Sequence, residues 1–190
     1  MADLGTATRA LPLAGFHGAS STVRLEAAPP AERISLRVRA EDVAALSGAL
    51  GVDLPVNPKT SAFANGRTAL WLGPDEWLVI DESGTGVGNG LMQATQNSGA
   101  LHSAADVSHR NTAILVSGTG AAKAINAGCP QDLSLKEFPV GACSRTIFGK
   151  VEIVLLRTAE DAFRVEVWRS FSDYAFGLLS EGARDAAVGK

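Results

Sequence analysis

The first clear pattern of apolar and polar positions lies in the stretch "RISLRVR", where Ile34, Leu36 and Val38 alternate with polar side chains. Alternation with a period of two is typical of a strand with one buried face. The next stretch, "AEDVAALSGALG", has apolar residues at helical spacing, acids in its first turn and Gly51 at its end. Acids suit the positive end of a helix dipole and glycine suits a helix C-terminus, so this stretch is predicted to be a helix.

Two strands and a weak helix follow in the first half of the chain. The apolar segments "RTALWLG" and "WLVID" are joined by the turn sequence "GPDE", which predicts a β-hairpin. A weak helical pattern then covers about residues 91–96. The first half therefore has the predicted order strand, helix, strand, strand, helix.

The second half of the chain repeats this order. Its predicted strands are "NTAILVSG", "SRTIFGKVEIVLLR" and "FRVEVW", and its predicted helices are "TGAAKAINAGC" and "SFSDYAFGLL". Leu36 precedes Asp53 by 17 positions, and Leu115 precedes Asp132 by the same 17 positions, which aligns the two halves. Because an internal repeat changes the fold prediction, we predict an α+β fold. Its duplicated strand-helix-strand-strand-helix halves form a mainly antiparallel sheet with helices packed on it.

The N-terminal segment has a different character. Residues 1–30 are rich in Ala, Gly, Pro and Ser and show no periodicity, so we expect a mobile arm, or one that is ordered only against a partner. Residues 31–185 are predicted to form a single domain, with its two halves at about 31–100 and 105–185.

Composition and charge exclude several classes of function. Apolar residues make up 46% of the 190 residues, an ordinary share for a globular protein. The net charge of −3 argues against nucleic acid as a partner. Arg33, Arg37 and Arg39 alternate along the first strand and are interpreted as its solvated face. No apolar run is long enough to span a bilayer and no secretory leader pattern is present, so we expect a cytoplasmic protein without a membrane partner.

Cysteine and histidine do not indicate a metal site. Cys129 and Cys143 are interpreted as small buried thiols, because a reducing compartment disfavours disulfides. His17, His102 and His109 are far apart in the sequence and show no metal-ligand spacing.

The stretch "ILVSGTGAAKAI" resembles a nucleotide-binding turn between a strand and a helix. A dinucleotide fingerprint needs a third glycine where Lys123 stands, and an acid about 20 residues on, whereas Asp132 follows sooner. The alternative is a tight corner shaped by Gly118 and Gly120, with Thr119 as the helix cap. We predict the corner, with no phosphate bound there.

The remaining polar groups do not form a catalytic constellation. Ser108 and His109 are adjacent in sequence, but adjacency does not create the geometry that activates a nucleophile. The segment from Asp106 to Ser108 is predicted to be a turn before a strand. Glu160 and Asp161 lie in a predicted hairpin turn and are interpreted as solvated. The sequence therefore predicts no catalytic, cofactor-binding or metal-binding residue in this chain.

The last predicted helix and the residues just before it carry more aromatic side chains than a thin core needs. These side chains either complete the core or meet a partner protein. The partner-interface candidates are Trp168, Arg169, Phe171, Tyr174 and Phe176.

Several segments together resemble a known family, in the right order over roughly residues 30–180. They are "LGPDEWLVI" (72–80), "DVSHR" (106–110), "VSGTGAAKAINAGCPQDL" (116–133), "F-x-x-G-x-C-x-R-T" (138–146) and "RSFSDYAFGLL" (169–179). This set resembles the gamma subunit of heterotetrameric sarcosine oxidase. At greater distance it is similar to the folate-binding domain of the aminomethyltransferase of the glycine cleavage system, which is itself a duplicated α+β domain.

The resemblance implies a structural role in an enzyme complex. Sarcosine would be oxidised to glycine and hydrogen peroxide, with the one-carbon unit passed to tetrahydrofolate. The resemblance implies alpha, beta and delta subunits as partners, and places FAD, FMN, NAD, tetrahydrofolate and zinc on those subunits. The gamma subunit resembles a folate-binding domain that has lost its ligand role.

The sequence departs from the aminomethyltransferase pattern where folate chemistry would occur. That family has a Gly-Gly-x-x-Asp-Asp segment on a strand, and the comparable stretch here is "FGKVEIVLL". It keeps Gly149 and at best Glu152, which is followed by the apolar Ile153. The leading hypothesis is a non-catalytic gamma subunit. The alternatives are a stand-alone folate-binding one-carbon transfer protein that uses Glu152 and, last, a dinucleotide-binding module.

Overall fold

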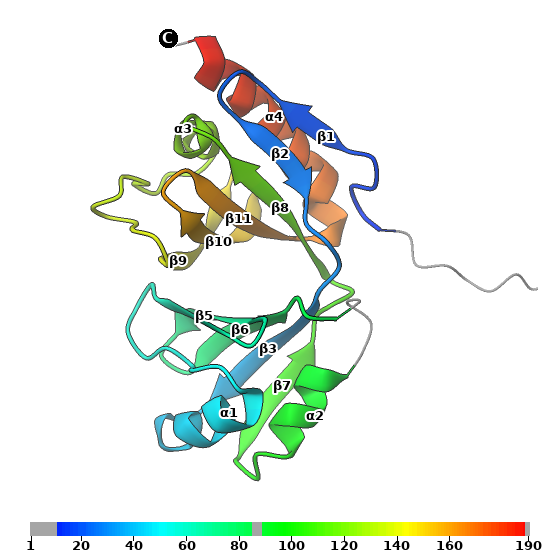
Figure 1. The fold of residues 1–190 in the computed structure, drawn as a ribbon, viewed down its shortest axis with the longest axis vertical. Coiled ribbons are helices and arrows are strands. Elements are labelled where there is room, and N and C mark those ends of the chain that lie inside the picture. The colour runs from blue at the N-terminus through cyan, green and yellow to red at the C-terminus, as the bar shows by residue number, and fades with distance from the viewer. Residues whose placement is uncertain (1–10, 85–88, 189–190) are drawn as a thin grey trace, which may run out of the picture.

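Two antiparallel sheets lie face to face in the middle of the molecule, with helices on their outer faces (Figure 1). This computed structural model describes residues 11–84 and 89–188. In spatial order, the six-stranded sheet contains β1 (His17–Ala19), β2 (Arg24–Ala27), β8 (Asn111–Ser117), β11 (Ala162–Trp168), β10 (Val151–Ala159) and β9 (Cys143–Phe148). The five-stranded sheet contains β4 (Ser61–Ala64), β5 (Arg67–Gly73), β6 (Glu76–Asp81), β3 (Glu32–Val38) and β7 (His102–Asp106).

Helices cover the outer face of each sheet. The first half contributes η1 (Ala40–Asp42), α1 (Val43–Leu50) and α2 (Gly90–Gln96), which lie below the five-stranded sheet in Figure 1. The second half contributes α3 (Ala121–Asn126), η2 (Arg169–Phe171) and α4 (Ser172–Val188), which lie on the six-stranded sheet. None of the helices in the described ranges is both long and apolar enough to cross a membrane.

Strand alternation divides the core into an outer cluster for each sheet and an inner cluster between the sheets. Ile34 and Leu36 of β3 pack with Leu46 of α1, whereas Ile114 of β8 packs with Leu179 of α4. The inner cluster contains the opposite faces of the same sheets. Its buried members are Ala31, Leu70, Leu78, Ile80, Val107, Cys143, Val154 and Leu156.

The two halves have the same internal order. In the first half the sheet runs β4–β5–β6–β3, and in the second half it runs β9–β10–β11–β8, with every pairing antiparallel. One further strand extends each set: β7 pairs with β3 in the five-stranded sheet, and the N-terminal strand β2 pairs with β8 in the six-stranded sheet. The predicted antiparallel α+β fold is confirmed, although the halves form two stacked sheets and not one continuous sheet.

The N-terminal segment differs from the sequence expectation. In the described part of the predicted arm, β1 and β2 form a hairpin that joins the six-stranded sheet through β8, and Leu25 is buried in the core. The expectation of a mobile arm is therefore wrong for these strands, and residues 1–10 lie outside the described residues. Strands of three and four residues are too short to show a periodic pattern, and their stability comes from pairing, of β1 with β2 and of β2 with β8.

Candidate functional site

The corner between β8 and α3 uses its backbone amides within the chain. The N–H of Gly118 donates to the carbonyl of Asp161 at 2.9 Å, and the N–H of Gly120 donates to the carbonyl of Thr22 at 3.0 Å. Gly118 has φ of +114°, and a Cβ there would overlap the carbonyl oxygen of Thr22. The Gly118 amide thus binds the β10–β11 turn and the Gly120 amide binds the β1–β2 turn, so neither points to a ligand, which supports the predicted corner.

The helix cap at this corner differs from the prediction. Gly120 occupies the N-cap position of α3, and no side chain forms a cap hydrogen bond there, so Thr119 is not the cap. The helix has only six residues, which limits its dipole. Thr119 instead lines a groove beside the β1–β2 turn.

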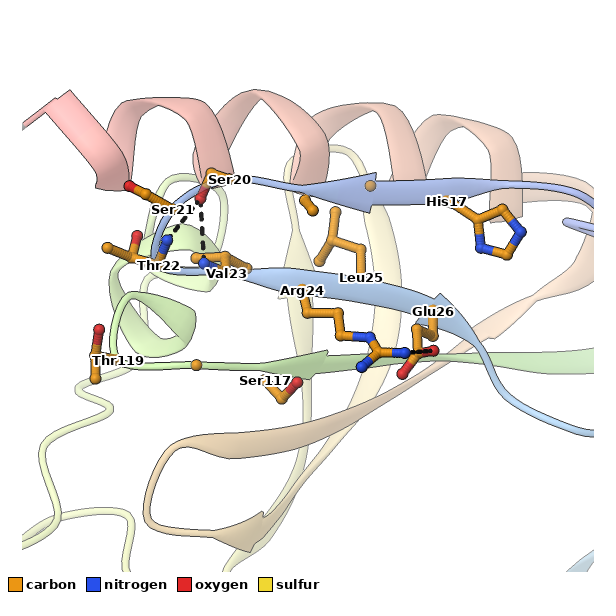
Figure 2. Close-up of a pocket in the computed structure, with 13 residues that line it drawn as sticks. His17, Ser20, Ser21, Thr22, Val23, Arg24, Leu25, Glu26, Ser117 and Thr119 are labelled. Carbon is orange, nitrogen blue, oxygen red and sulfur yellow. Dashed lines mark hydrogen bonds and ion pairs between the residues drawn. The ribbon is translucent and has the colours of Figure 1, made fainter.

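That groove is the broad concave surface shown in Figure 2, with a volume of about 830 Å³. The Ser20 hydroxyl accepts the N–H groups of Thr22 and Val23, and Arg24 donates to Glu26 at 2.7 Å. The side chains of Arg24 and Glu26 extend from β2 on the side away from α4 (Figure 2). These polar groups form hydrogen bonds with one another along the hairpin. The groove is therefore interpreted as a solvated surface and not as a ligand site.

A buried ion-pair network joins the two sheets. Arg33 of β3 donates from Nε and Nη2 to both carboxylate oxygens of Glu166 on β11, at 2.8 and 3.1 Å. Arg164 donates to the same carboxylate at 2.7 Å and to Glu82 at 2.5 Å. The side chains of Arg33 and Glu166 are 3% and 1% exposed, so the predicted solvated role of Arg33 is wrong.

Arg33 is buried because the second sheet covers the polar face of β3. Arg37 and Arg39, from the same alternating set, are exposed as predicted. Arg37 lies near the C-terminal end of β3 and pairs with Asp75 and Glu76. The sequence therefore located the polar face correctly but not its burial.

A second ion pair between the sheets lies at a small cleft, called here the Glu76 cleft. Glu76 of β6 binds Arg145 of β9, and this hydrogen bond is the main cause that raises the Arg145 pKa, whereas partial burial acts in the opposite direction. Glu152 is half-exposed, and its carboxylate lies 3.8 Å from Arg145 Nε. The cleft has a volume of about 180 Å³, and Arg110 and Trp168 also line it. Glu152 is thus a surface carboxylate beside an arginine.

The other candidate groups have structural contacts. Ser108 donates to Asp106 at 2.6 Å and accepts the backbone N–H of Arg33 at 2.9 Å, so the predicted turn is present and holds β3. His109 is exposed. Both cysteines are buried free thiols. Within residues 11–84 and 89–188, no three potential ligand side chains gather in a metal-binding arrangement.

Aromatic side chains gather at the start of α4. Trp168 stacks on Phe171 with ring centroids 6.1 Å apart, and the Arg110 guanidinium lies 5.1 Å from the Trp168 ring. Tyr174 follows one helical turn after Phe171, and the three aromatic side chains are each 41–43% exposed. We call Arg110, Trp168, Phe171 and Tyr174 the aromatic surface.

Two of the predicted interface residues lie apart from this set. Phe176 is 5% exposed and contacts the Phe16 ring edge-on at 5.4 Å, so it belongs to the core. Arg169 is partly buried, and its backbone N–H donates to the carbonyl of Arg110 at 2.7 Å. That bond brings Arg110 close to Trp168, which is 58 positions later in the chain. Local sequence pattern does not predict this contact.

The fold is shared with a known transferase class. The aminomethyltransferase T of the glycine cleavage system from Bartonella henselae superposes with a TM-score of 0.66, covering 87% of this chain and 49% of that chain. At 16% identity, this similarity defines the fold alone. The heterotetrameric sarcosine oxidase from Corynebacterium sp. U-96, in complex with pyrrole 2-carboxylate, superposes at a TM-score of 0.80. That match has 26% identity and covers 91% of this chain and 90% of that chain.

Sequence comparison gives the particular family. Residues 38–185 match the family model described as "Sarcosine oxidase, gamma subunit family". The sarcosine oxidase subunit gamma of Arthrobacter sp. is 33% identical over 145 residues, which are 76% of this chain and 70% of that protein. That of Corynebacterium sp. (strain U-96) is 32% identical over 138 residues, 72% and 66% of the two chains. This chain belongs to the sarcosine oxidase gamma subunit family, as the resemblance implied.

Proposed function

We propose that this chain is the gamma subunit of a heterotetrameric sarcosine oxidase and that it supports assembly without contributing catalytic residues. The complex would demethylate sarcosine oxidatively to glycine and pass the one-carbon unit to tetrahydrofolate. Alpha, beta and delta subunits would be its partners and would carry FAD, FMN, NAD, tetrahydrofolate and zinc. The observation that carries the proposal is family membership over most of the chain. The structure supports it, because the buried acids Glu166 and Glu76 form ion pairs with arginine side chains of this chain.

The residues near Glu152 do not fit a folate ligand. The Glu152 carboxylate is half-exposed beside Arg145, and the next residue, Ile153, is buried in the outer core. The adjoining Glu76 cleft, at about 180 Å³, is smaller than the roughly 300 Å³ at which small-molecule pockets usually begin. This arrangement supports a structural role and gives no basis for a folate step on this chain.

The aromatic surface supports the assembly role. Tryptophan, tyrosine and arginine are enriched among the residues that contribute most to binding at protein interfaces. Trp168 and Phe171 form a stack with Arg110, so they are already ordered before a partner arrives. We therefore propose that the aromatic surface contacts another subunit.

Affinity purification from the native host tests this function. The tagged chain is expected to recover flavin-containing subunits, visible from the absorbance of the eluate. Trp168→Ala and Phe171→Ala should each lower that recovery by about tenfold while the melting temperature stays within a few degrees. Leu101→Ala is the matched control, since Leu101 is apolar and 67% exposed and lies just before β7, outside the aromatic surface. Recovery of no flavoprotein by the wild-type chain would contradict the proposed function.

Calorimetric titration separates the structural role from folate transfer. Tetrahydrofolate added to the purified chain is expected to give no saturable heat. Saturable binding that is lost in Glu152→Gln would support the folate-binding alternative instead.

A further inference from the structure

Two glycines lie inside α4, and the packing of the described residues explains one of them. An added Cβ on Gly182 would overlap the carbonyl oxygen of Ala124, so this glycine lets α3 and α4 pack closely. Gly177 is exposed, and an added Cβ there would meet no other atom within 4 Å among the described residues. Glycine is less favourable than alanine in a helix interior, so Gly177 weakens α4 without a packing gain inside this part of the chain.

Gly177 lies on the same face of α4 as Tyr174 and Glu181, and we call these three residues the Gly177 face. Tyr174 precedes Gly177 by three positions and Glu181 follows it by four, which is the spacing of neighbours on a helix surface. All three residues are exposed. Helical side chains lean toward the helix N-terminus, so the Glu181 side chain leans toward Gly177. The helix backbone is therefore accessible between a tyrosine ring and a carboxylate.

The Gly177 face continues the aromatic surface along the helix. Tyr174 belongs to both, and Trp168 and Phe171 precede it at the start of α4. Exposed aromatic side chains that lie together indicate a protein contact, and a glycine beside them lets another chain approach the helix backbone closely. A contact that begins at Trp168 can therefore extend along α4 to Glu181, on the side of the six-stranded sheet where α4 lies (Figure 1).

The exposed charges of α4 are mostly negative. They are three carboxylates and one guanidinium, which belong to Asp173, Glu181, Asp185 and Arg184, and none of them forms an ion pair with another described residue. The last turn of α4 contains no basic residue, so the negative end of the helix dipole adds to this charge.

The cations near the aromatic surface lie at the other end of the helix. The Arg110 guanidinium lies on the Trp168 ring, and Lys150 follows Gly149, whose added Cβ would overlap the Tyr174 hydroxyl. The potential therefore becomes more negative from the start of α4 toward Glu181 and the C-terminal end. A partner that extends along this face meets negative charge at Gly177 and beyond, which favours a cation there.

We propose that α4 docks a basic side chain of a partner subunit, which lies over Gly177 with its apolar stem on the Tyr174 ring and its charge beside the Glu181 carboxylate. The inference rests on the proposed function, because it requires a partner subunit, and it names the chemistry of that contact. Basic side chains combine an apolar stem with a cationic end, and a cation is attracted to the face of a tyrosine ring. Glycine at position 177 leaves the room that the stem needs.

Gly177→Gln tests whether the partner needs the space over the glycine. The remaining subunits are prepared from a host strain that lacks this gene, and the dissociation constant of the purified chain is measured by biolayer interferometry. Glutamine is the better helix former, so the melting temperature of the free variant should rise by about 1–3 °C. Its side chain occupies the docking space, so binding should weaken by about tenfold. A loss of affinity in a stabilised chain cannot come from unfolding.

Gly48→Gln is the matched control for this substitution. Gly48 lies in α1, is exposed, and has open space where its Cβ would be. The control should gain the same thermal stability and bind the other subunits as tightly as the wild type. Binding of Gly177→Gln that equals the wild type would overturn the inference.

Glu181→Gln tests the sign of the partner's charge. A basic side chain predicts binding about three to ten times weaker at low salt, with a smaller difference at high salt. Arg184→Gln removes the exposed cation of α4 and should leave binding at least as tight as that of the wild type. Asp53→Asn is the control, since Asp53 is an exposed acid that follows α1. Unchanged or tighter binding of Glu181→Gln would show that the docked side chain is not basic and would overturn the proposal.

The wild-type measurement separates this inference from the proposed function. If the wild-type chain does not bind the other subunits at all, the proposed function fails. If the wild type binds and the Gly177→Gln and Glu181→Gln variants match it, the inference about α4 alone fails.

Discussion

Arg33 and Glu166 form a two-point buried ion pair between β3 and β11, with donor–acceptor distances of 2.8 and 3.1 Å. The pair lies between the two sheets, and Glu166 also accepts a hydrogen bond from Arg164. Glu166 therefore bridges two guanidinium groups that are almost entirely removed from water, and Glu82 supplies a second negative charge to Arg164. The contact of the two halves depends on charge pairing as well as on the apolar inner cluster.

Glu166→Gln is predicted to destabilise the protein by about 3 kcal/mol, because it leaves two buried cations without their shared anion. The free energy of unfolding, measured by urea denaturation at pH 7, checks this. Arg24→Ala removes an exposed pair instead, since the side chains of Arg24 and Glu26 are 70% and 42% exposed, and should change stability by less than about 0.5 kcal/mol. Equal effects of the two substitutions would refute the importance assigned to burial.

Gly118→Ala is predicted to destabilise the protein by about 2 kcal/mol or more. Its φ of +114° is strained for any side chain, and an added Cβ would overlap the carbonyl of Thr22. The same change in the middle of α1, Gly48→Ala, meets open space and should raise stability by about 0.5–1 kcal/mol. Thermal unfolding of both variants measures this contrast, and a tolerant Gly118→Ala would contradict the account of the corner.

Local patterns in the sequence predicted the helices and strands more accurately than they predicted how the two halves of the chain align. Equal spacing matched Leu36 to Leu115, yet Leu36 lies in an outer cluster, whereas Leu115 lines an opening between the sheets together with Leu156 and Arg164. Ile114 is the residue of β8 that faces the helices. A shift of one residue along a strand moves a side chain to the opposite face, so weak identity could not fix this register.

Contacts between distant segments could not be predicted from local pattern. The alternation in "RISLRVR" correctly assigned Arg33 to the polar face of its strand, but burial of that face depends on the other sheet. Likewise, the spacing of Phe176 after Phe171 does not show that Phe176 is buried and Phe171 exposed. The Phe16 ring, from the other end of the chain, packs against Phe176. The sequence analysis named the three aromatic residues of the aromatic surface as interface candidates but not Arg110, whose position depends on the backbone hydrogen bond to Arg169.

Cys143 is predicted to be unreactive in the folded protein. Burial raises the pKa of its thiol to about 12, although a hydrogen bond to the carbonyl of Trp71 acts in the opposite direction. At pH 8 only about one molecule in ten thousand would then carry the reactive thiolate. Iodoacetamide labelling followed by peptide mass spectrometry should show modification of Cys143 only after denaturation. Val56→Cys supplies an exposed thiol as a labelling control, and rapid modification of Cys143 alongside it would contradict the prediction.

Asp81 is predicted to make stability depend on pH in the acid range. Burial tends to raise its pKa, but hydrogen bonds from Ser83 and Arg67, with the Arg67 charge, outweigh burial and leave the pKa below the usual 3.8. Since the folded-state pKa is the lower one, the contribution of Asp81 is complete above pH 3.8 and is lost as the pH falls through the folded-state value.

Urea unfolding of the wild type and of Asp81→Asn between pH 2.5 and 7 checks this dependence. The variant should be less stable at pH 7, because it lacks the charged partner of Arg67, which approaches Asp81 at 2.7 Å. The difference should shrink below about pH 4, where protonation removes the same charge from the wild type. A stability difference that stays constant over the whole range would show that Asp81 has the same pKa in the folded and unfolded chains.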